Sequence, residues 1–287
     1  MSKKVLMVLE EKNRHWVGDG FYVYGLLRPD NELNKIISPF ILLDYASPMK
    51  FKPSEMPKGV GQHPHRGFET VTFAYQGEVE HKDSSGAIGI IKTGDIQWMT
   101  AGKGIIHEEF HSREFSKAGG VFEMVQLWVN LPKRYKMIKP SYQAIAKKDI
   151  PTVSVKNNSI LRVIAGKYNN ITGPTNTFTE INIYDIYSKE KENINLNFSS
   201  GTNTMILIMS GNASIDNKNY EEKSILIFER DKNLLCFETS KDFKALVLNG
   251  KPIDEPVVSY GPFVMNTKQE ILTAINDYQN GSMADIT

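Results

Sequence analysis

Two short segments of the chain carry metal-binding side chains at alternate positions. His63 and His65 flank Pro64, and His107 is followed two residues later by Glu109. In a strand, residues i and i+2 point to the same face, so each segment can direct both side chains at one point. Imidazole nitrogens bind a transition metal at about 2 Å. Two such strands in one barrel would supply three neutral nitrogens and one carboxylate.

This set of donors suits several ions. Iron, manganese, nickel, cobalt, copper and zinc all accept imidazole and carboxylate ligands, and the residues do not choose among them. A purely structural zinc site usually uses cysteines, which favours a catalytic role for a histidine-rich site. A structural site that only holds the barrel together remains an alternative.

The fourth ligand depends on strand alternation. A single His-x-His pair arises often by chance, and the second pair on a separate segment strengthens the hypothesis. Alternation places Glu109 beside His107 and Glu108 on the opposite face. A β-bulge in this segment would exchange the two glutamates. We therefore expect Glu109 as the ligand, with Glu108 as the alternative.

The other histidines are interpreted as ordinary residues. His81 is expected at the surface near the end of a strand, and His15 lies in a polar segment. His111 shares the face of His107, so a supporting role behind the ligands is the alternative to a loop histidine. None of the six histidines occurs after position 111, which confines an imidazole-based site to the first half of the chain.

Many short segments rich in Val, Ile, Phe and Tyr must position these side chains. Turn signals such as DSSG at 83–86 and KTGD at 92–95 separate them, and this spacing predicts an all-β sandwich or barrel. A second series of such segments follows residues 131–158, whose prolines and lysines are typical of a connection. We expect two domains, at residues 1–135 and 136–287.

The two halves of the chain also resemble each other. Residues 73–80 and 205–214 share an apolar run, a glycine and a further β segment, which aligns Gly77 with Gly211 and suggests a duplication. In this alignment Asn197 and Ser199 take the places of the first two histidines, so no metal is expected in the second half.

One helix is predicted near the C-terminus. Thr267 and Glu270 have the spacing of a capping box, apolar residues follow at helical spacing, and Gly281 stands where a helix would end. Its expected role is structural.

Composition excludes several classes of function. The 287 residues include 34 basic and 33 acidic side chains, a net charge of +1 that gives no general attraction to nucleic acid or anionic lipid. No run approaches the roughly 20 apolar residues of a membrane span, and the apolar stretch at residues 5–9 is too short for a signal peptide. One cysteine forms no intrachain disulfide. We expect a cytoplasmic protein that binds neither membranes nor nucleic acid directly.

The longest motifs resemble those of a known family. Residues 61–72 (GQHPHRGFETVT) resemble the signature of pirins, which are bicupin proteins of the cupin superfamily. Residues 94–107 (GDIQWMTAGKGIIH), 126–132 (QLWVNLP) and 260–267 (YGPFVMNT) are similar to further pirin motifs. The resemblance spans nearly the whole chain. It implies two cupin-type β-barrels, or double-stranded β-helices, with metal in the first alone and a helix at the C-terminus.

The resemblance also implies a ligand set. Pirins bind iron or a similar ion through both histidines of the His-Pro-His motif, a third histidine, and a glutamate two residues beyond it. Those positions are His63, His65, His107 and Glu109. Iron is the first choice of metal, with nickel, manganese, cobalt, copper and zinc as alternatives. The chain departs from the usual family pattern at Glu108, where relatives have a small residue.

Two functions follow from the resemblance. Some pirins resemble quercetinases, oxidoreductases that open the flavonol ring with dioxygen and release carbon monoxide. For this quercetin 2,3-dioxygenase-like reaction, Glu109 would take the flavonol proton. Eukaryotic pirins are known as transcription cofactors whose iron state alters partner binding, so the alternative is a non-enzymatic, iron- or redox-sensitive regulator that acts by protein–protein contact. We expect a monomer.

Overall fold

The computed structural model describes residues 2–29, 31–84 and 86–283. The chain divides into two compact units. We call one the N-terminal barrel and the other the C-terminal barrel. The N-terminal barrel comprises Asn13–Asn31, Phe40–Lys147 and Ile253–Thr287. The C-terminal barrel comprises Met1–Lys12, Glu32–Pro39 and Lys148–Pro252.

The N-terminal barrel consists of two antiparallel sheets. The larger sheet has seven strands in the order β12-β9-β6-β11-β4-β3-β2, and the smaller has four in the order β5-β10-β7-β8. Their bounds are β2 Arg14–Val17, β3 Phe21–Leu27, β4 Phe40–Phe51, β5 Gly59–His65, β6 Phe68–Gln76, β7 Val79–Asp83, β8 Ile88–Ile91, β9 Ile96–Thr100, β10 Ile105–His111, β11 Gly120–Asn130 and β12 Ser141–Ile145.

The C-terminal barrel has the same pair of sheets. Its larger sheet runs β1-β22-β19-β24-β17-β14-β13 and its smaller sheet β18-β23-β20-β21. The bounds are β1 Val5–Glu10, β13 Thr152–Lys156, β14 Ser159–Ala165, β17 Ile181–Ser188, β18 Glu192–Asn197, β19 Asn203–Ser210, β20 Ala213–Ile215, β21 Lys218–Tyr220, β22 Ser224–Phe228, β23 Leu234–Thr239 and β24 Phe243–Gly250.

Short elements connect these strands. They are α1 Asn31–Ile37, α2 Arg113–Ala118, the 3-10 turns η1 Lys133–Tyr135 and η2 Lys147–Asp149, and the strand pair β15 Lys167–Tyr168 with β16 Ile171–Thr172. None of the helices described is long and apolar enough to cross a membrane.

Each end of the chain belongs to the barrel that is formed mainly by the other half of the sequence. Strand β1 pairs with β22 and forms an edge of the C-terminal barrel, in the place that β12 takes in the other barrel. The hairpin β25 (Val258–Tyr260) and β26 (Phe263–Met265), with helix α3 (Lys268–Gln279), belongs to the N-terminal barrel. Each compact unit therefore includes a segment from the far end of the chain, unlike the consecutive domains expected at 1–135 and 136–287. The reason is that strands pair and pack with partners that can lie far away in the sequence.

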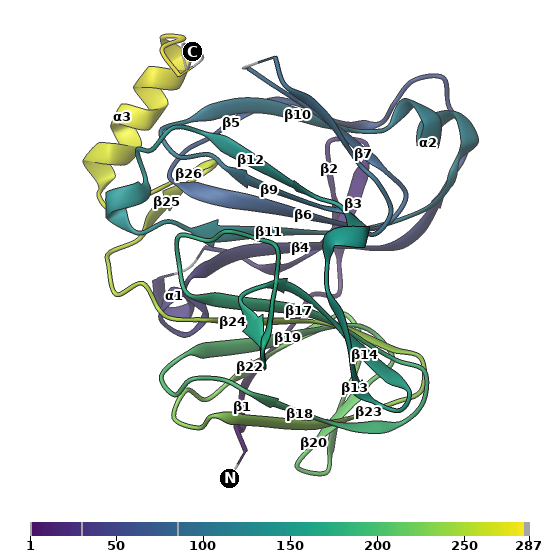
Figure 1. Cartoon of the computed structure of the whole chain (residues 1–287). Coiled ribbons are helices and arrows are strands. Elements are labelled where there is room, and N and C mark those ends of the chain that lie inside the picture. Colours follow the sequence, from purple (N-terminus) through teal and green to yellow (C-terminus); the bar gives the residue numbers. More distant parts are fainter. Residues whose placement is uncertain (1, 30, 85, 284–287) are drawn as a thin grey trace. The chain divides into compact units, whose positions relative to one another are not determined.

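Helix α3 has the predicted cap. The Thr267 side chain accepts from the backbone of Glu270, whose carboxylate accepts from the Thr267 amide at 2.8 Å. Its buried face, with Ile271 and Ala274, packs against Phe263 of β26 and its neighbours. In Figure 1 the yellow helix lies beside this strand pair. The helix thus completes the N-terminal barrel.

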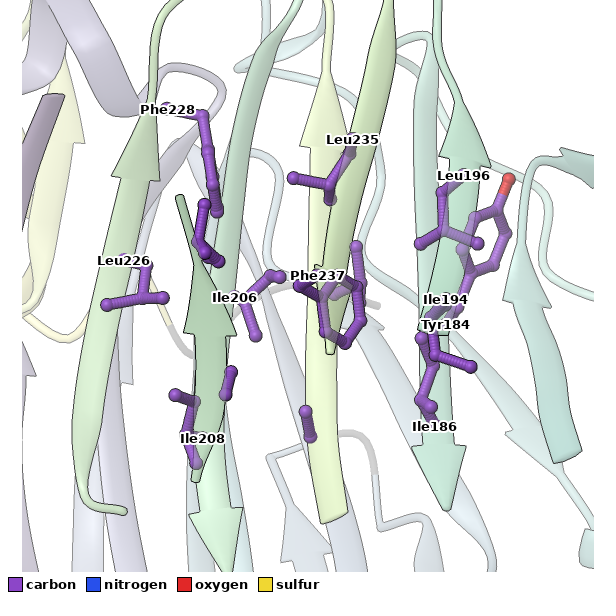
Figure 2. Packing of buried hydrophobic residues seen from close by; sticks show 14 of the residues in the cluster. Tyr184, Ile186, Ile194, Leu196, Ile206, Ile208, Leu226, Phe228, Leu235 and Phe237 are labelled. Atoms are coloured by element: carbon purple, nitrogen blue, oxygen red, sulfur yellow. The ribbon is translucent and has the colours of Figure 1, made fainter. Parts of the chain in front are cut away.

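The interior of the C-terminal barrel is filled with apolar side chains. In β18, Ile194 and Leu196 are buried, while the asparagines between and beside them are exposed. This alternation is typical of an antiparallel sheet with one face on a core. Figure 2 shows these two side chains among others of the same core, from Tyr184 to Phe237. Among the described residues, the group of three metal-type donors lies at His63, His65 and His107 and not in this core.

Candidate metal centre

Strands β5 and β10 bring the predicted histidines together. The strands pair antiparallel, with His107 opposite His63 and Ile105 opposite His65. One donor atom from each of the three imidazoles lies within 4.8 Å of the others. The ring centroids are 4.4–4.9 Å apart. The three rings converge on a volume in which they can share one ion.

A bulge does occur here, but it lies in β5. His107 opposes His63 and Glu109 opposes Val60, so two residues of β5 face the single Glu108. Strand β10 keeps its alternation: His107 and Glu109 are buried, and Glu108 is half-buried on the other face. The bulge therefore does not exchange the two glutamates.

The carboxyl group of Glu109 lies in the wall of the same pocket as two of the histidines. It is 7% exposed, and its Oε1 lies 3.4 Å from the hydroxyl of Thr72. Burial raises the pKa of Glu109 to about 7, opposed by the Thr72 hydroxyl. Among the described residues, the set of donors within 4.8 Å contains the imidazoles and not this carboxylate.

The ring nitrogens are suited to binding a cation. Nδ1 of His63 lies 2.9 Å from the carbonyl oxygen of Gly61, which fixes that ring. Nδ1 of His65 and Nε2 of His107 are buried without a hydrogen-bond partner in the described parts of the chain. Burial lowers the pKa of all three imidazoles, which keeps them neutral with a lone pair to donate. Buried polar atoms normally have partners, so these nitrogens fit a bound metal ion.

His63 and His65 line a pocket of about 230 Å³. Its wall is mostly apolar, which is typical of a site for a small organic ligand. Trp128 packs edge-on against His65, with a centroid distance of 5.4 Å, and lies tilted on Phe68 at 4.3 Å. The lining consists of Val17, Phe21, Val23, Asp44, Val60, His63, His65, Glu109, Met124, Gln126, Trp128 and Pro262.

The interpretation of His81 as a surface residue was wrong. It is 2% exposed and lies in β7 opposite Glu109 of β10. In β7, residues Val79, His81 and Asp83 are buried, whereas Glu80 is half-buried and Lys82 is exposed. The sequence does indicate this burial, since His81 lies two residues after the apolar Val79 and so shares its face of the strand. The polar residues His81 and Asp83 at these inward positions nevertheless look like the exposed end of a strand.

His111 is not a loop residue. It is the last residue of β10, 2% exposed, and its Nε2 donates to the carbonyl oxygen of Gly20 at 3.0 Å. Burial lowers its pKa to about 4. Its ring packs among aromatic rings of Phe21, Phe51, Phe115 and Phe122. It is a core residue. His15, by contrast, is exposed.

The corresponding ladder of the C-terminal barrel carries no histidine. Asn197 and Ser199, which the glycine alignment matched to the first two histidines, are both exposed. The inward ladder pairs there are Ile194 with Phe237 and Leu196 with Leu235. Residues 198–202 connect β18 to β19, whereas only residues 66 and 67 connect β5 to β6. The alignment of Gly77 with Gly211 contains no gap, so the longer connection shifts the residues that it matches between β5 and β18.

Two barrels with the same strand order, one of them holding a histidine cluster, define a bicupin protein with a metal-type site. The family model described as Pirin matches residues 24–129, and the Pirin C-terminal cupin domain matches residues 183–284. The chain belongs to the pirin family. The family and the all-β, two-cupin fold with a C-terminal helix are confirmed.

Relatives extend over nearly the whole chain. A Pseudomonas aeruginosa protein with the name "Putative quercetin 2,3-dioxygenase PA2418" is 48% identical over 97% of this chain and 98% of its own. Pirin-1 of Arabidopsis thaliana is 36% identical over 97% of this chain and 92% of its own. The crystal structure of a quercetin 2,3-dioxygenase from Acinetobacter baumannii is similar with a TM-score of 0.96 and 49% identity, covering 100% of both chains.

Proposed function

We propose that the N-terminal barrel binds one divalent transition-metal ion through His63, His65 and His107, with Glu109 as the fourth ligand. Iron is the first choice, and nickel, manganese, cobalt, copper or zinc are alternatives. The protein uses this ion as a quercetin 2,3-dioxygenase-like enzyme that opens a flavonol with dioxygen. The observation that carries the proposal is the cluster of three imidazole donors within 4.8 Å at an apolar pocket.

The metal, when bound, supplies a Lewis acid that favours the deprotonated flavonol. The carboxylate of Glu109 takes the proton of the flavonol 3-hydroxyl, because it lines the pocket and its hydrogen bond from Thr72 is long, at 3.4 Å. Phe21 and Trp128 offer flat faces and edges to an aromatic substrate. The apolar lining excludes water from the reactive carbanion-like flavonolate until dioxygen arrives.

The names of the relatives support the reaction class. The Pseudomonas and Acinetobacter proteins carry quercetin 2,3-dioxygenase names at 48% and 49% identity. A purely regulatory role would not require an apolar pocket beside the histidines. That pocket favours a small aromatic substrate over a protein partner.

The test is oxygen uptake with quercetin by protein loaded separately with each of the six metals, after metal analysis of the purified chain. We expect oxygen consumption and carbon monoxide release in equal amounts, lost in His63→Ala. His15→Ala is the matched control, because this histidine of the same barrel is exposed. Full metal occupancy without consumption of flavonol or oxygen would contradict the enzymatic proposal, and a partner captured only by the metal-loaded protein would favour regulation instead.

A further inference from the structure

A further buried histidine, His81, packs against the ring of His107 with a centroid distance of 5.5 Å. Strand β7 pairs with β10, with His81 opposite Glu109 and Asp83 opposite His107. His81 is 2% exposed and Asp83 7%. His81 is not part of the three-donor cluster, and the proposed reaction does not use it. A buried imidazole next to a metal ligand therefore needs an explanation.

Three contacts run outward from His107. Its Nδ1 lies 3.4 Å from Nδ1 of His81. Nε2 of His81 lies 3.7 Å from Oδ2 of Asp83, an electrostatic contact that is longer than a hydrogen bond. The other oxygen of Asp83 accepts from the backbone amide of Ala87 at 3.3 Å. The ring of Tyr142 packs on His81 with a centroid distance of 4.7 Å. Both His81 and Asp83 are thus held in place.

The order of these groups favours one arrangement of the protons. A neutral imidazole has one N–H donor and one acceptor nitrogen, and a carboxylate can only accept. The negative charge of Asp83 near Nε2 of His81 favours the tautomer with the proton on Nε2, which leaves Nδ1 of His81 as an acceptor. His107 must then carry its own proton on Nδ1. Its Nε2, which has no hydrogen-bond partner among the described residues, keeps a lone pair directed away from His81.

The opposite arrangement fits poorly. If His81 donated to His107, the proton of His107 would sit on Nε2, among His63 and His65, and no described group accepts it there. That tautomer could not bind a metal through Nε2. The carboxylate of Asp83, which lies beside His81 and not beside His107, therefore favours the first of these two tautomers.

We propose that His81 is a positioning residue for the metal centre, which accepts the Nδ1–H of His107, holds that ring in its metal-binding tautomer, and is itself oriented by Asp83. The inference rests on the metal site proposed above, but not on the reaction catalysed there. Partners of this kind are worth about 10- to 100-fold in metal affinity when removed.

The test measures Co²⁺ affinity by competition with a chelator, together with the visible spectrum of the bound ion. We expect His81→Leu, which removes the acceptor, to weaken binding about 10- to 100-fold. His81→Asn places an amide oxygen near the position of Nδ1, so it should recover most of that loss. Asp83→Asn keeps the shape but lowers the acceptor strength, and it should shift the cobalt absorption bands at full occupancy with a smaller loss of affinity.

Two controls separate the explanations. His111→Leu removes another buried histidine of β10, 2% exposed like His81, and should lower the melting temperature while leaving cobalt affinity within about threefold. His63→Ala should abolish binding, and unchanged binding in that variant would overturn the metal site itself.

The positioning role is overturned by any of three results. His81→Leu binds cobalt as tightly as wild type with a native circular dichroism spectrum, His111→Leu loses as much affinity as His81→Leu, or Asp83→Asn leaves both affinity and spectrum unchanged. If His81→Leu fails to fold, the near-isosteric Asp83→Asn variant still decides through the cobalt spectrum.

Discussion

The two barrels share one strand order and differ in what fills them. In the N-terminal barrel, the β5–β10 ladder presents His63, His65 and His107 to the interior. In the C-terminal barrel, the equivalent β18–β23 ladder presents Ile194, Leu196 and apolar partners on β23. The same topology therefore holds a histidine cluster in one barrel and an apolar core in the other, and Figure 2 shows that apolar core.

The difference shows that one strand order accommodates either a histidine cluster or an apolar ladder at the same place. Apolar burial stabilises a barrel at about 25 cal/mol per Å², whereas buried imidazoles without partners lower stability. In the N-terminal barrel, α3 and the β25–β26 hairpin add a further small apolar core. Among the described residues, the C-terminal barrel has no matching histidine cluster.

The largest effect is expected in the apolar barrel. Phe237 is buried against Phe243 at a centroid distance of 6.0 Å, so Phe237→Ala should cost about 3–5 kcal/mol of unfolding free energy. Urea unfolding measures this loss. Metal affinity should stay within about twofold of wild type, and a large loss of affinity would break the separation between the barrels.

The converse change is His107→Ala in the metal barrel. Removing a ligand should weaken metal binding by more than about a hundredfold, beyond what loss of a supporting partner costs. The melting temperature of the metal-free protein should change little, because the lost ring has an unpartnered buried nitrogen. Calorimetry with and without metal measures both. A variant that still gains stability from metal would contradict the ligand assignment.

A buried carboxyl group should make the stability of the N-terminal barrel depend on pH. Glu69 of β6 is fully buried, and burial raises its pKa to about 7, opposed by hydrogen bonds such as that from Thr100. The glycine alignment places the uncharged Asn203 at the matching position of β19. Because the folded pKa lies above the unfolded value, stability is full below about pH 4.5 and declines as the pH rises through 7.

The variant that tests this is Glu69→Gln. Relative to the variant, wild type should lose about 2 kcal/mol of unfolding free energy between pH 5 and pH 8. Denaturant unfolding of the metal-free proteins at both pH values measures the difference. Parallel pH profiles for wild type and Glu69→Gln would show that Glu69 does not titrate in this range.

The smallest effect concerns helix α3. Thr267→Ala removes the capping box and should cost about 1 kcal/mol. Amide hydrogen exchange should show faster exchange in the helix and in the β25–β26 hairpin, with no change in β18 and β23. Equal loosening of the C-terminal barrel would contradict the assignment of this helix to the N-terminal one.

The sequence by itself determined the elements governed by local spacing. Parity in His63-Pro64-His65 and in His107 to Glu109 predicted which side chains share a face, and β10 keeps that parity. The capping box of α3 was also predicted, because its hydrogen bonds join residues three apart. The pirin motifs predicted the family and the two-cupin fold.

Only the tertiary structure decided the features that depend on which strands become neighbours. The burial of His81 follows from the pairing of β7 with β10 and from the ring of Tyr142, and no local pattern specifies such contacts. The same reason explains why β1 belongs to the C-terminal barrel and α3 to the N-terminal barrel. It also explains why Asn197 is exposed and does not take the place of His63. Sequence spacing fixes the direction of a side chain along its own strand, whereas its surroundings are set by segments far away in the chain.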